Sequence, residues 1–221
     1  MFGLFGKTYK LLGPASGTEA AVPTGEQLFR IQASKDIPIH GVKRGDLGGF
    51  MGVGAKLSGQ AWVAEDGKLF GLAEAKDEAW IGGVSFVCGF ATIAGAARIE
   101  GQAYVEDHAV IRDNARVDGT ARVVDDSRVS GNAHITGHAF VAENAKVQDN
   151  AHVADDVIVR HNAVVSENAR ISGKAIVGEN AKVYGDAVVT DRAVVFGNAC
   201  VHGTARVNGD MSVSGDANVW C

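Results

Sequence analysis

The sequence predicts an all-β protein, a parallel β-helix in which each six-residue repeat forms one short strand and one corner. From residue 55 to residue 221 the chain reads as 28 hexads without insertion or deletion, the last of them five residues long. Alanine fills the first position of 23 hexads, and valine, isoleucine or leucine fills the third position of all but one. A strict repeat of this kind is typical of a solenoid, whose stacked repeats bury one continuous core.

The roles of the six positions follow from strand geometry. Side chains two residues apart in a strand point to the same side, so the first and third positions face the interior. The second and fourth positions then face outward. The fifth and sixth positions are dominated by Gly, Asp, Glu and Asn. Because Gly, Asn and Asp tolerate the left-handed backbone conformation, we expect a corner at these two positions.

A small residue two places before an aliphatic one, every six residues, resembles the hexapeptide-repeat family of left-handed β-helices. The resemblance covers residues 55–221 and implies three hexads per triangular coil, hence a prism of about nine coils. Asparagine supports this period, because at the sixth position it recurs every 18 residues in two columns that would stack as amide ladders. The columns are Asn114, Asn132, Asn150 and Asn168, and Asn144, Asn162, Asn180 and Asn198. Coils about 4.8 Å apart give a prism about 45 Å long.

Residues 1–54 lie outside the hexad frame and are predicted to form a short N-terminal β cap. Alternation over residues 27–33 (QLFRIQA) predicts a strand, and Gly45, Gly48 and Gly49 predict a tight turn that leads into the first coil. An apolar solenoid end requires such a cap. The stretch GDLGG (45–49) with GQAWV (59–63) also resembles a group of uncharacterised bacterial and bacteriophage β-helix proteins. Some of these carry an acyltransferase label that rests on the repeat alone.

Composition narrows the classes of function. The net charge is -5, with about +2 on residues 1–54 and about -7 on the rest, so nucleic acid is not an expected partner. No apolar leader or run of 18 apolar residues is present, so neither a signal peptide nor a membrane span is expected. Three scattered cysteines favour a reducing compartment such as the cytoplasm, and the resemblance above implies a bacterial or phage-encoded protein. No cofactor and no metal site are expected.

Three hexads per coil give the prism three outer faces, each formed by the second and fourth positions of every third hexad. Face one begins with the hexad at residue 61 and has a basic column that we interpret as an anion-binding strip: Arg98, Arg116, His134, His152 and Arg170. Face two begins with the hexad at residue 55 and has the composition of an ordinary polar surface. Face three begins with the hexad at residue 67 and is largely apolar.

An exposed apolar strip on a soluble protein usually marks an interface. Face three therefore predicts a homo-oligomer, and the family resemblance implies a trimer. The predicted interface residues are Phe86, Tyr104, Phe140, Ile158, Ile176, Val194 and Phe196. Cover by residues 1–54 is the competing interpretation. The last hexad ends at Cys221 without a cap, which adds end-to-end association or a further protein partner as alternatives.

Two classes of function remain open. The first is a non-enzymatic structural or interaction protein, a rigid β-helix that self-associates through face three. The alternative is an acyltransferase-like enzyme that uses an acyl-CoA donor on a small metabolite. His134 and His152, which would stack on face one, are its candidate catalytic bases, because an imidazole is the usual general base. No loop interrupts the hexads to build a pocket, and this favours the first class.

Overall fold

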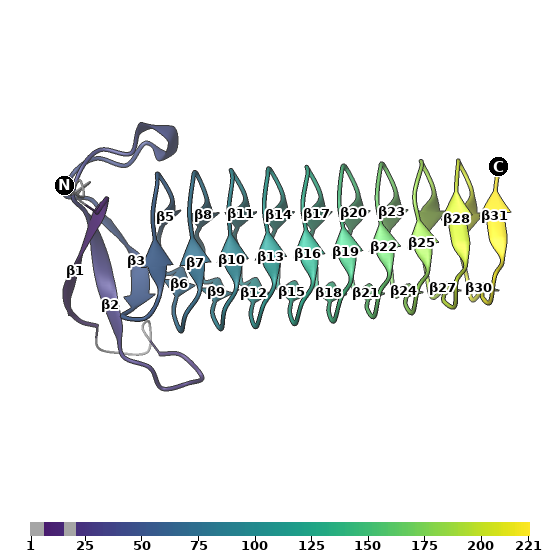
Figure 1. The fold of residues 1–221 in the computed structure, drawn as a ribbon, viewed down its shortest axis with the longest axis horizontal. Coiled ribbons are helices and arrows are strands. Elements are labelled where there is room, and N and C mark those ends of the chain that lie inside the picture. The colour runs from purple at the N-terminus through teal and green to yellow at the C-terminus, as the bar shows by residue number, and fades with distance from the viewer. Residues whose placement is uncertain (1–6, 16–20) are drawn as a thin grey trace, which may run out of the picture.

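The computed structural model describes residues 7–15 and 21–221 and shows a three-sided β-helix with an antiparallel cap at its N-terminal end (Figure 1). Each hexad from residue 55 contributes one strand, from β4 to β31, and these strands form three parallel sheets. The predicted all-β architecture with three hexads per coil is therefore confirmed. Within the described residues, no helix is long and apolar enough to cross a membrane.

Each sheet forms one face of the prism. Face one comprises β5 (Trp62–Val63), β8 (Trp80–Ile81), β11 (Arg98–Ile99), β14 (Arg116–Val117), β17 (His134–Ile135), β20 (His152–Val153), β23 (Arg170–Ile171), β26 (Val188–Val189) and β29 (Arg206–Val207). Face two comprises β4 (Lys56–Leu57), β7 (Glu74–Ala75), β10 (Thr92–Ile93), β13 (Val110–Ile111), β16 (Arg128–Val129), β19 (Lys146–Val147), β22 (Val164–Val165), β25 (Lys182–Val183), β28 (Cys200–His202) and β31 (Asn218–Trp220). Face three comprises β6 (Lys68–Leu69), β9 (Phe86–Val87), β12 (Tyr104–Val105), β15 (Arg122–Val123), β18 (Phe140–Val141), β21 (Ile158–Val159), β24 (Ile176–Val177), β27 (Val194–Val195) and β30 (Ser212–Val213).

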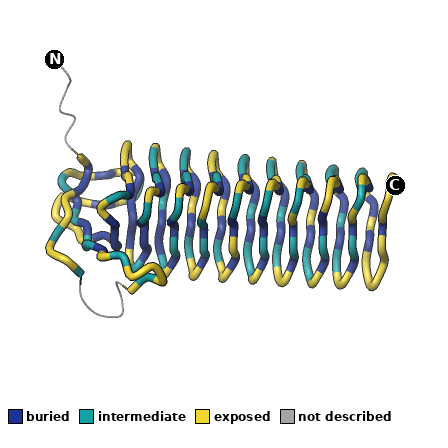
Figure 2. The backbone as a smooth tube through the Cα atoms, turned by 60° about the horizontal axis from the view of Figure 1, so that its bottom comes forward, coloured by how far each residue is buried: buried dark blue, intermediate teal, exposed yellow. Residues whose placement is uncertain are grey.

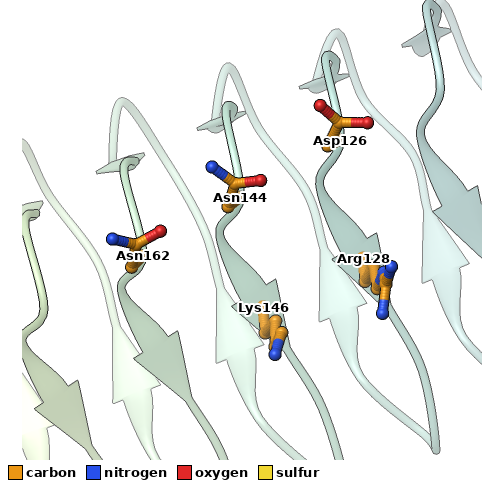
Figure 3. Close-up of a pocket in the computed structure, with 5 residues that line it drawn as sticks. All are labelled: Asp126, Arg128, Asn144, Lys146 and Asn162. Atoms are coloured by element: carbon orange, nitrogen blue, oxygen red, sulfur yellow. The ribbon is translucent and has the colours of Figure 1, made fainter.

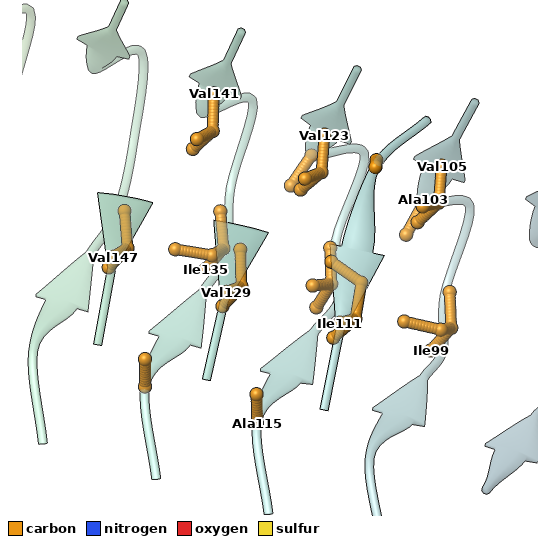
Figure 4. Close-up of a cluster of buried hydrophobic side chains, with 14 of the residues drawn as sticks. Ile99, Ala103, Val105, Ile111, Ala115, Val123, Val129, Ile135, Val141 and Val147 are labelled. Atoms are coloured by element: carbon orange, nitrogen blue, oxygen red, sulfur yellow. The ribbon is translucent and has the colours of Figure 1, made fainter. Parts of the chain in front are cut away.

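The first and third hexad positions fill a narrow interior, as the repeat predicts. From residue 61 to residue 207 every one of them is buried (Figure 2). Their side chains converge between the three sheets (Figure 4). Two buried serines replace alanine at the first position. The hydroxyl of Ser85 donates to the carbonyl of Gly82 at 2.7 Å, and that of Ser127 to the carbonyl of Val124 at 2.6 Å. These hydrogen bonds satisfy the buried hydroxyls, so the exchange leaves the core intact.

The corners depend on the fifth hexad position, which adopts the left-handed conformation. Among the described residues, twelve non-glycine residues have positive φ; eleven are Asp or Glu, the other is His161, and none is Asn. Such a conformation is unfavourable for residues with a Cβ. Most of these side chains offset the cost by accepting a hydrogen bond from the backbone N–H of the residue 18 positions on. Asp113 accepts in this way from Gly131 at 3.0 Å, and Glu167 from Gly185 at 2.9 Å.

The two predicted asparagine columns form hydrogen-bonded ladders at the sixth position. Asn114 donates from its side-chain amide to Asn132 at 3.1 Å, and the ladder continues through Asn150 and Asn168 to Asp186. The second ladder runs through Asn162, Asn180, Asn198 and Asp216, with separations of 2.9 to 3.1 Å, whereas Asn144, the first member of the predicted column, is not hydrogen-bonded to Asn162. The chain order places these two corners on either side of face two. Amide ladders therefore flank both edges of face two from Asn162 onward, and one edge from Asn114.

The cap consists of three antiparallel strands and a short 3-10 helix. These elements are β1 (Tyr9–Pro14), β2 (Leu28–Ala33), η2 (Pro38–His40) and β3 (Leu47–Gly52). The strand predicted over residues 27–33 is confirmed as β2. Strand β3 also pairs in parallel with β6, which joins the cap to the sheet of face three.

The tight turn predicted at Gly48 and Gly49 is wrong, since both residues lie within β3. A Cβ on Gly48 would lie 2.5 Å from the carbonyl oxygen of Val63, and one on Gly49 would lie 2.4 Å from that of Gly67. Glycine is required here because the cap strand approaches the first coil closely. Only Gly45 of the predicted turn has a positive φ, of 98°.

Candidate functional site

The described residues of the cap pack against face three at its N-terminal end. A small buried cluster joins cap and coils, and its members are Leu28, Phe50, Phe70 and Cys88. Phe86 and Tyr104, two residues of the predicted interface, pack against this cluster. The ammonium of Lys68 lies 4.8 Å from the centroid of the Phe86 ring. These two aromatic side chains therefore already have partners within the chain.

The rest of face three lies beyond the cap. Phe140, Ile158, Ile176 and Val194 are half-buried, and Phe196 is 37% exposed. A hollow of about 170 Å³ opens near the C-terminal end of this strip. It is lined by Arg160, His161, Ile176, Gly178, Glu179, Val194 and Phe196. Five of the seven predicted interface residues thus lie on a continuous, partly exposed apolar strip.

Face one begins as a network of ion pairs, which changes the interpretation of its basic column. Arg98 donates to Glu100 at 2.8 Å, and Arg116 bridges Glu100 at 2.9 Å and Asp118 at 2.7 Å. The next member of the column, His134, lies 3.0 Å from Asp118. The carboxylates at the fourth position thus neutralise the first half of the predicted anion strip.

His134 and His152, the two candidate bases, lie in contact on adjacent coils. Their ring centroids are 5.0 Å apart, and the rings meet edge to face. Burial tends to raise the pKa of Asp118, but hydrogen bonds from Thr136 and His134 outweigh it, and the pKa lies below its usual range. Burial lowers the pKa of His152, and the neighbouring charges of His134 and Arg170 lower it further. An ionised Asp118 is therefore positioned to orient the His134 imidazole, with a neutral His152 beside it.

The second half of face one carries cations without carboxylate partners. Neither Arg170 nor Arg206 forms an ion pair with any of the described residues. Both line an open hollow of about 610 Å³, together with Asn150, Asn168, Asp186 and Val188. Sequence reasoning included Arg170 in the strip but not Arg206. The basic column alone does not distinguish paired from unpaired arginines.

Face two, predicted to be an ordinary polar surface, has two hollows that share Arg128 and Lys146. One, of about 450 Å³, is lined by Asp126, Arg128, Asn144, Lys146 and Asn162 (Figure 3). The other, of about 180 Å³, is lined by Arg112, Arg128, Ser130, Lys146 and Gln148. The sequence contains these basic and polar residues, but it does not show that they gather, because each hollow takes its lining residues from three successive coils.

The remaining histidines lie at corners or form local contacts. His138 is at the corner of the His134 hexad, with its side chain 73% exposed and 3.6 Å from Asp156. His161 accepts a hydrogen bond at Nδ1 from the backbone N–H of Glu179 at 3.0 Å. Over residues 7–15 and 21–221, no group of three or more His, Cys, Asp or Glu side chains has the arrangement of a metal site.

Comparison with known proteins places the fold. No protein-family model matches the chain, and no curated protein matches it. Among solved structures, the UDP-N-acetylglucosamine acyltransferase from Campylobacter jejuni is similar, with a TM-score of 0.50 and 19% sequence identity over 73% of this chain. The fold is a hexapeptide-repeat left-handed β-helix. The match spans 66% of the Campylobacter jejuni chain, just under two thirds of its length. LpxA from Acinetobacter baumannii has a TM-score of 0.37 and 15% identity, over 75% of this chain and 71% of that one.

Proposed function

We propose that this β-helix transfers an acyl group from an acyl-CoA thioester to a hydroxyl or amine of a small metabolite, with His134 as general base. The proposal depends on the 3.0 Å contact between His134 Nε2 and Asp118 Oδ2. A carboxylate that holds an imidazole fixes its tautomer and orientation, as a general base requires. The similar protein from Campylobacter jejuni is an acyltransferase, and its shared fold supports the reaction class.

The proton path follows from that contact. Asp118 accepts the Nε2–H of His134, so Nδ1 is the nitrogen that takes the proton from the acceptor's O–H or N–H. The acceptor atom then attacks the thioester carbonyl carbon, the C–S bond breaks, and the thiolate leaves with the proton returned by Nδ1. Arg170, one coil beyond His152, supplies an unpaired cation for the phosphates of the donor. Because face one is open, a second subunit would complete the site and exclude water.

The decisive experiment measures thiol release from acetyl-CoA and longer acyl-CoA thioesters across a panel of amine and hydroxyl acceptors, with products identified by mass spectrometry. We expect His134→Gln to lower kcat/KM by about 10²- to 10⁴-fold, the usual contribution of a general base. His138→Gln is the matched control, since His138 lies on the same hexad but at the corner. Native protein that neither releases thiol nor is thermally stabilised by acetyl-CoA would refute acyl transfer.

The second candidate is the non-enzymatic role, a rigid β-helix that self-associates through face three. The observation that favours it is the apolar strip beyond the cap, where Phe140, Ile158, Ile176 and Val194 are half-buried and Phe196 is exposed. We propose a homotrimer, with residues 1–54 as the cap of one prism and residues 55–221 as its coils. End-to-end association stays a prediction. Three free thiols, Cys88, Cys200 and Cys221, support a location in the bacterial cytoplasm.

Charge placed on face three tests self-association. We expect Phe140→Lys with Ile158→Lys to convert an oligomer into a monomer, because the interface would bury two unpaired ammonium groups. Light scattering measures the mass. Val164→Lys is the matched control, since Val164 has the same half-buried outward position on face two. A native protein that is already monomeric, or a double variant of unchanged mass, would exclude this interface.

A further inference from the structure

The central part of face two concentrates positive charge without compensating acids. From β10 to the C-terminal end of the chain, the outward second and fourth positions of this face contain no Asp or Glu. Within the part of the chain that the structure describes, Arg128 and Lys146 have no ion pair, and the exposed Arg112 reaches Asp113 only at 4.0 Å. This differs from face one, where carboxylates pair with Arg98 and Arg116.

The cations stand between two hollows, so a ligand could contact them from both sides. Arg128 and Lys146 line the hollow of about 450 Å³ (Figure 3) and also that of about 180 Å³. The remaining lining groups are mostly neutral hydrogen-bonding side chains: Ser130, Gln148, Asn144 and Asn162. One acid, Asp126, sits at the edge of the larger hollow, 4.0 Å from His108 on its other side. The site therefore combines charge with hydroxyl and amide groups.

The scaffold holds these groups at fixed spacing. Val110, Arg128 and Lys146 are consecutive partners in the parallel sheet, so their backbones lie about 4.8 Å apart. One edge of the site is tied by the asparagine ladder from Asn114 to Asn168, which limits movement of neighbouring coils, and the ladder on the other edge begins at Asn162. A site on such a rigid surface pays little ordering entropy when a ligand binds.

We propose that this site binds an acidic oligosaccharide, a glycan whose sugars carry carboxylate or sulfate groups. Its anionic groups would be held by Arg128 and Lys146, and its hydroxyls would exchange hydrogen bonds with Ser130, Gln148 and the flanking asparagines. The lining favours a glycan over single-stranded nucleic acid. Proteins that bind single strands stack the bases on aromatic side chains, and neither hollow is lined by one. This proposal is independent of acyl transfer on face one.

The test is calorimetric titration of the full chain with four probes of equal length: an oligogalacturonate, a heparin-derived oligosaccharide, a neutral malto-oligosaccharide and oligo-dT. We expect at least one acidic oligosaccharide to bind, more weakly as salt rises, and the neutral probe not to bind. Arg128→Gln with Lys146→Gln should weaken binding at least about tenfold, the loss of one or two charge-assisted contacts. Lys182→Gln, two coils beyond Lys146 on the same face, is the matched control and should change affinity less than about twofold.

Several outcomes would overturn the proposal. The first is that neither acidic oligosaccharide binds, and the second is that oligo-dT binds more tightly than both of them. The third is that the double variant and Lys182→Gln lose the same affinity for the acidic oligosaccharide. Thermal melting of the double variant distinguishes lost binding from lost structure; both side chains are outward and unpaired, so an unchanged midpoint is expected. If the double variant unfolds, the proposal is tested instead by the salt dependence of binding and by the choice among the four probes, both measured with the native chain. His134→Gln should bind the glycan like the native chain, which separates failure here from failure of acyl transfer.

Discussion

Faces one and two share one scaffold and one strand spacing, and each carries a column of basic residues. On face one, the residue two places after Arg98 is Glu100 and the one after Arg116 is Asp118, and each pair forms a salt bridge. On face two, the residue two places after Arg128 is Ser130, and Lys146 is followed by Gln148. Arg98 and Arg116 are neutralised by these acids, whereas the charges of Arg128 and Lys146 have no carboxylate partner among the described residues.

This difference teaches that the fourth hexad position decides what a basic column can do. The interiors behind the two faces are similar, mostly alanine alternating with valine or isoleucine, so the core does not account for the difference between the outward residues. Where an acid follows, as on face one, the cations hold a carboxylate that can orient His134. Where a neutral residue follows, as on face two, the cations stay available to an anion.

Adding an acid to face two at the position that Asp118 has on face one is the change with the larger expected effect. In Ser130→Asp, the new carboxylate would stand to Arg128 as Asp118 stands to Arg116, which it contacts at 2.7 Å. We expect the affinity of face two for an acidic oligosaccharide to fall at least about tenfold, through loss of an available cation and gain of a repelling charge. Calorimetric titration measures it, with the neutral Ser130→Asn as control. Equal affinity in Ser130→Asp and the native chain would show that the fourth position does not set availability.

Much of the fold could be predicted because the interior repeats locally. Alanine and valine recur with period six, and the asparagine columns add the period of 18 that fixes three strands per coil. The corner carboxylates were predicted only as residues that tolerate a turn. Their second role, accepting the N–H of the next coil as Asp113 does for Gly131, depends on contacts 18 residues apart. Gly48 and Gly49 were misplaced for a similar reason, since their close contact with the first coil has no local signal.

The candidate site was harder to predict because it depends on side-chain pairing between coils. The sequence identified His134, His152 and their column on face one. It did not show that Arg116 bridges acids on two coils, nor that His134 is held by Asp118 from the preceding coil. On face two, the residues around Arg128 look ordinary one hexad at a time. Only their stacking produces a cationic site between two hollows.

Acid titration offers a smaller effect that separates the two faces again, because His152 of face one is partly buried. Burial and the charges of His134 and Arg170 lower its folded-state pKa below 6.5. Below about pH 6.5, His152 therefore takes up a proton in the unfolded chain but not yet in the folded chain. As the pH decreases further, the free energy of unfolding decreases until the pH reaches the folded-state pKa of His152. His152→Gln should reduce this slope, as measured by urea unfolding between about pH 5 and 8, and the part due to His40, whose pKa is also lowered by burial, should stay. Asp118, whose pKa is also lowered, acts in a separate window: its contribution is present above about pH 3.9 and is lost as pH falls through the folded pKa. His138→Gln is the control, because that side chain is 73% exposed. A slope in His152→Gln equal to the native slope would mean that His152 is as solvated as a corner histidine, and that face one is as open there as face two.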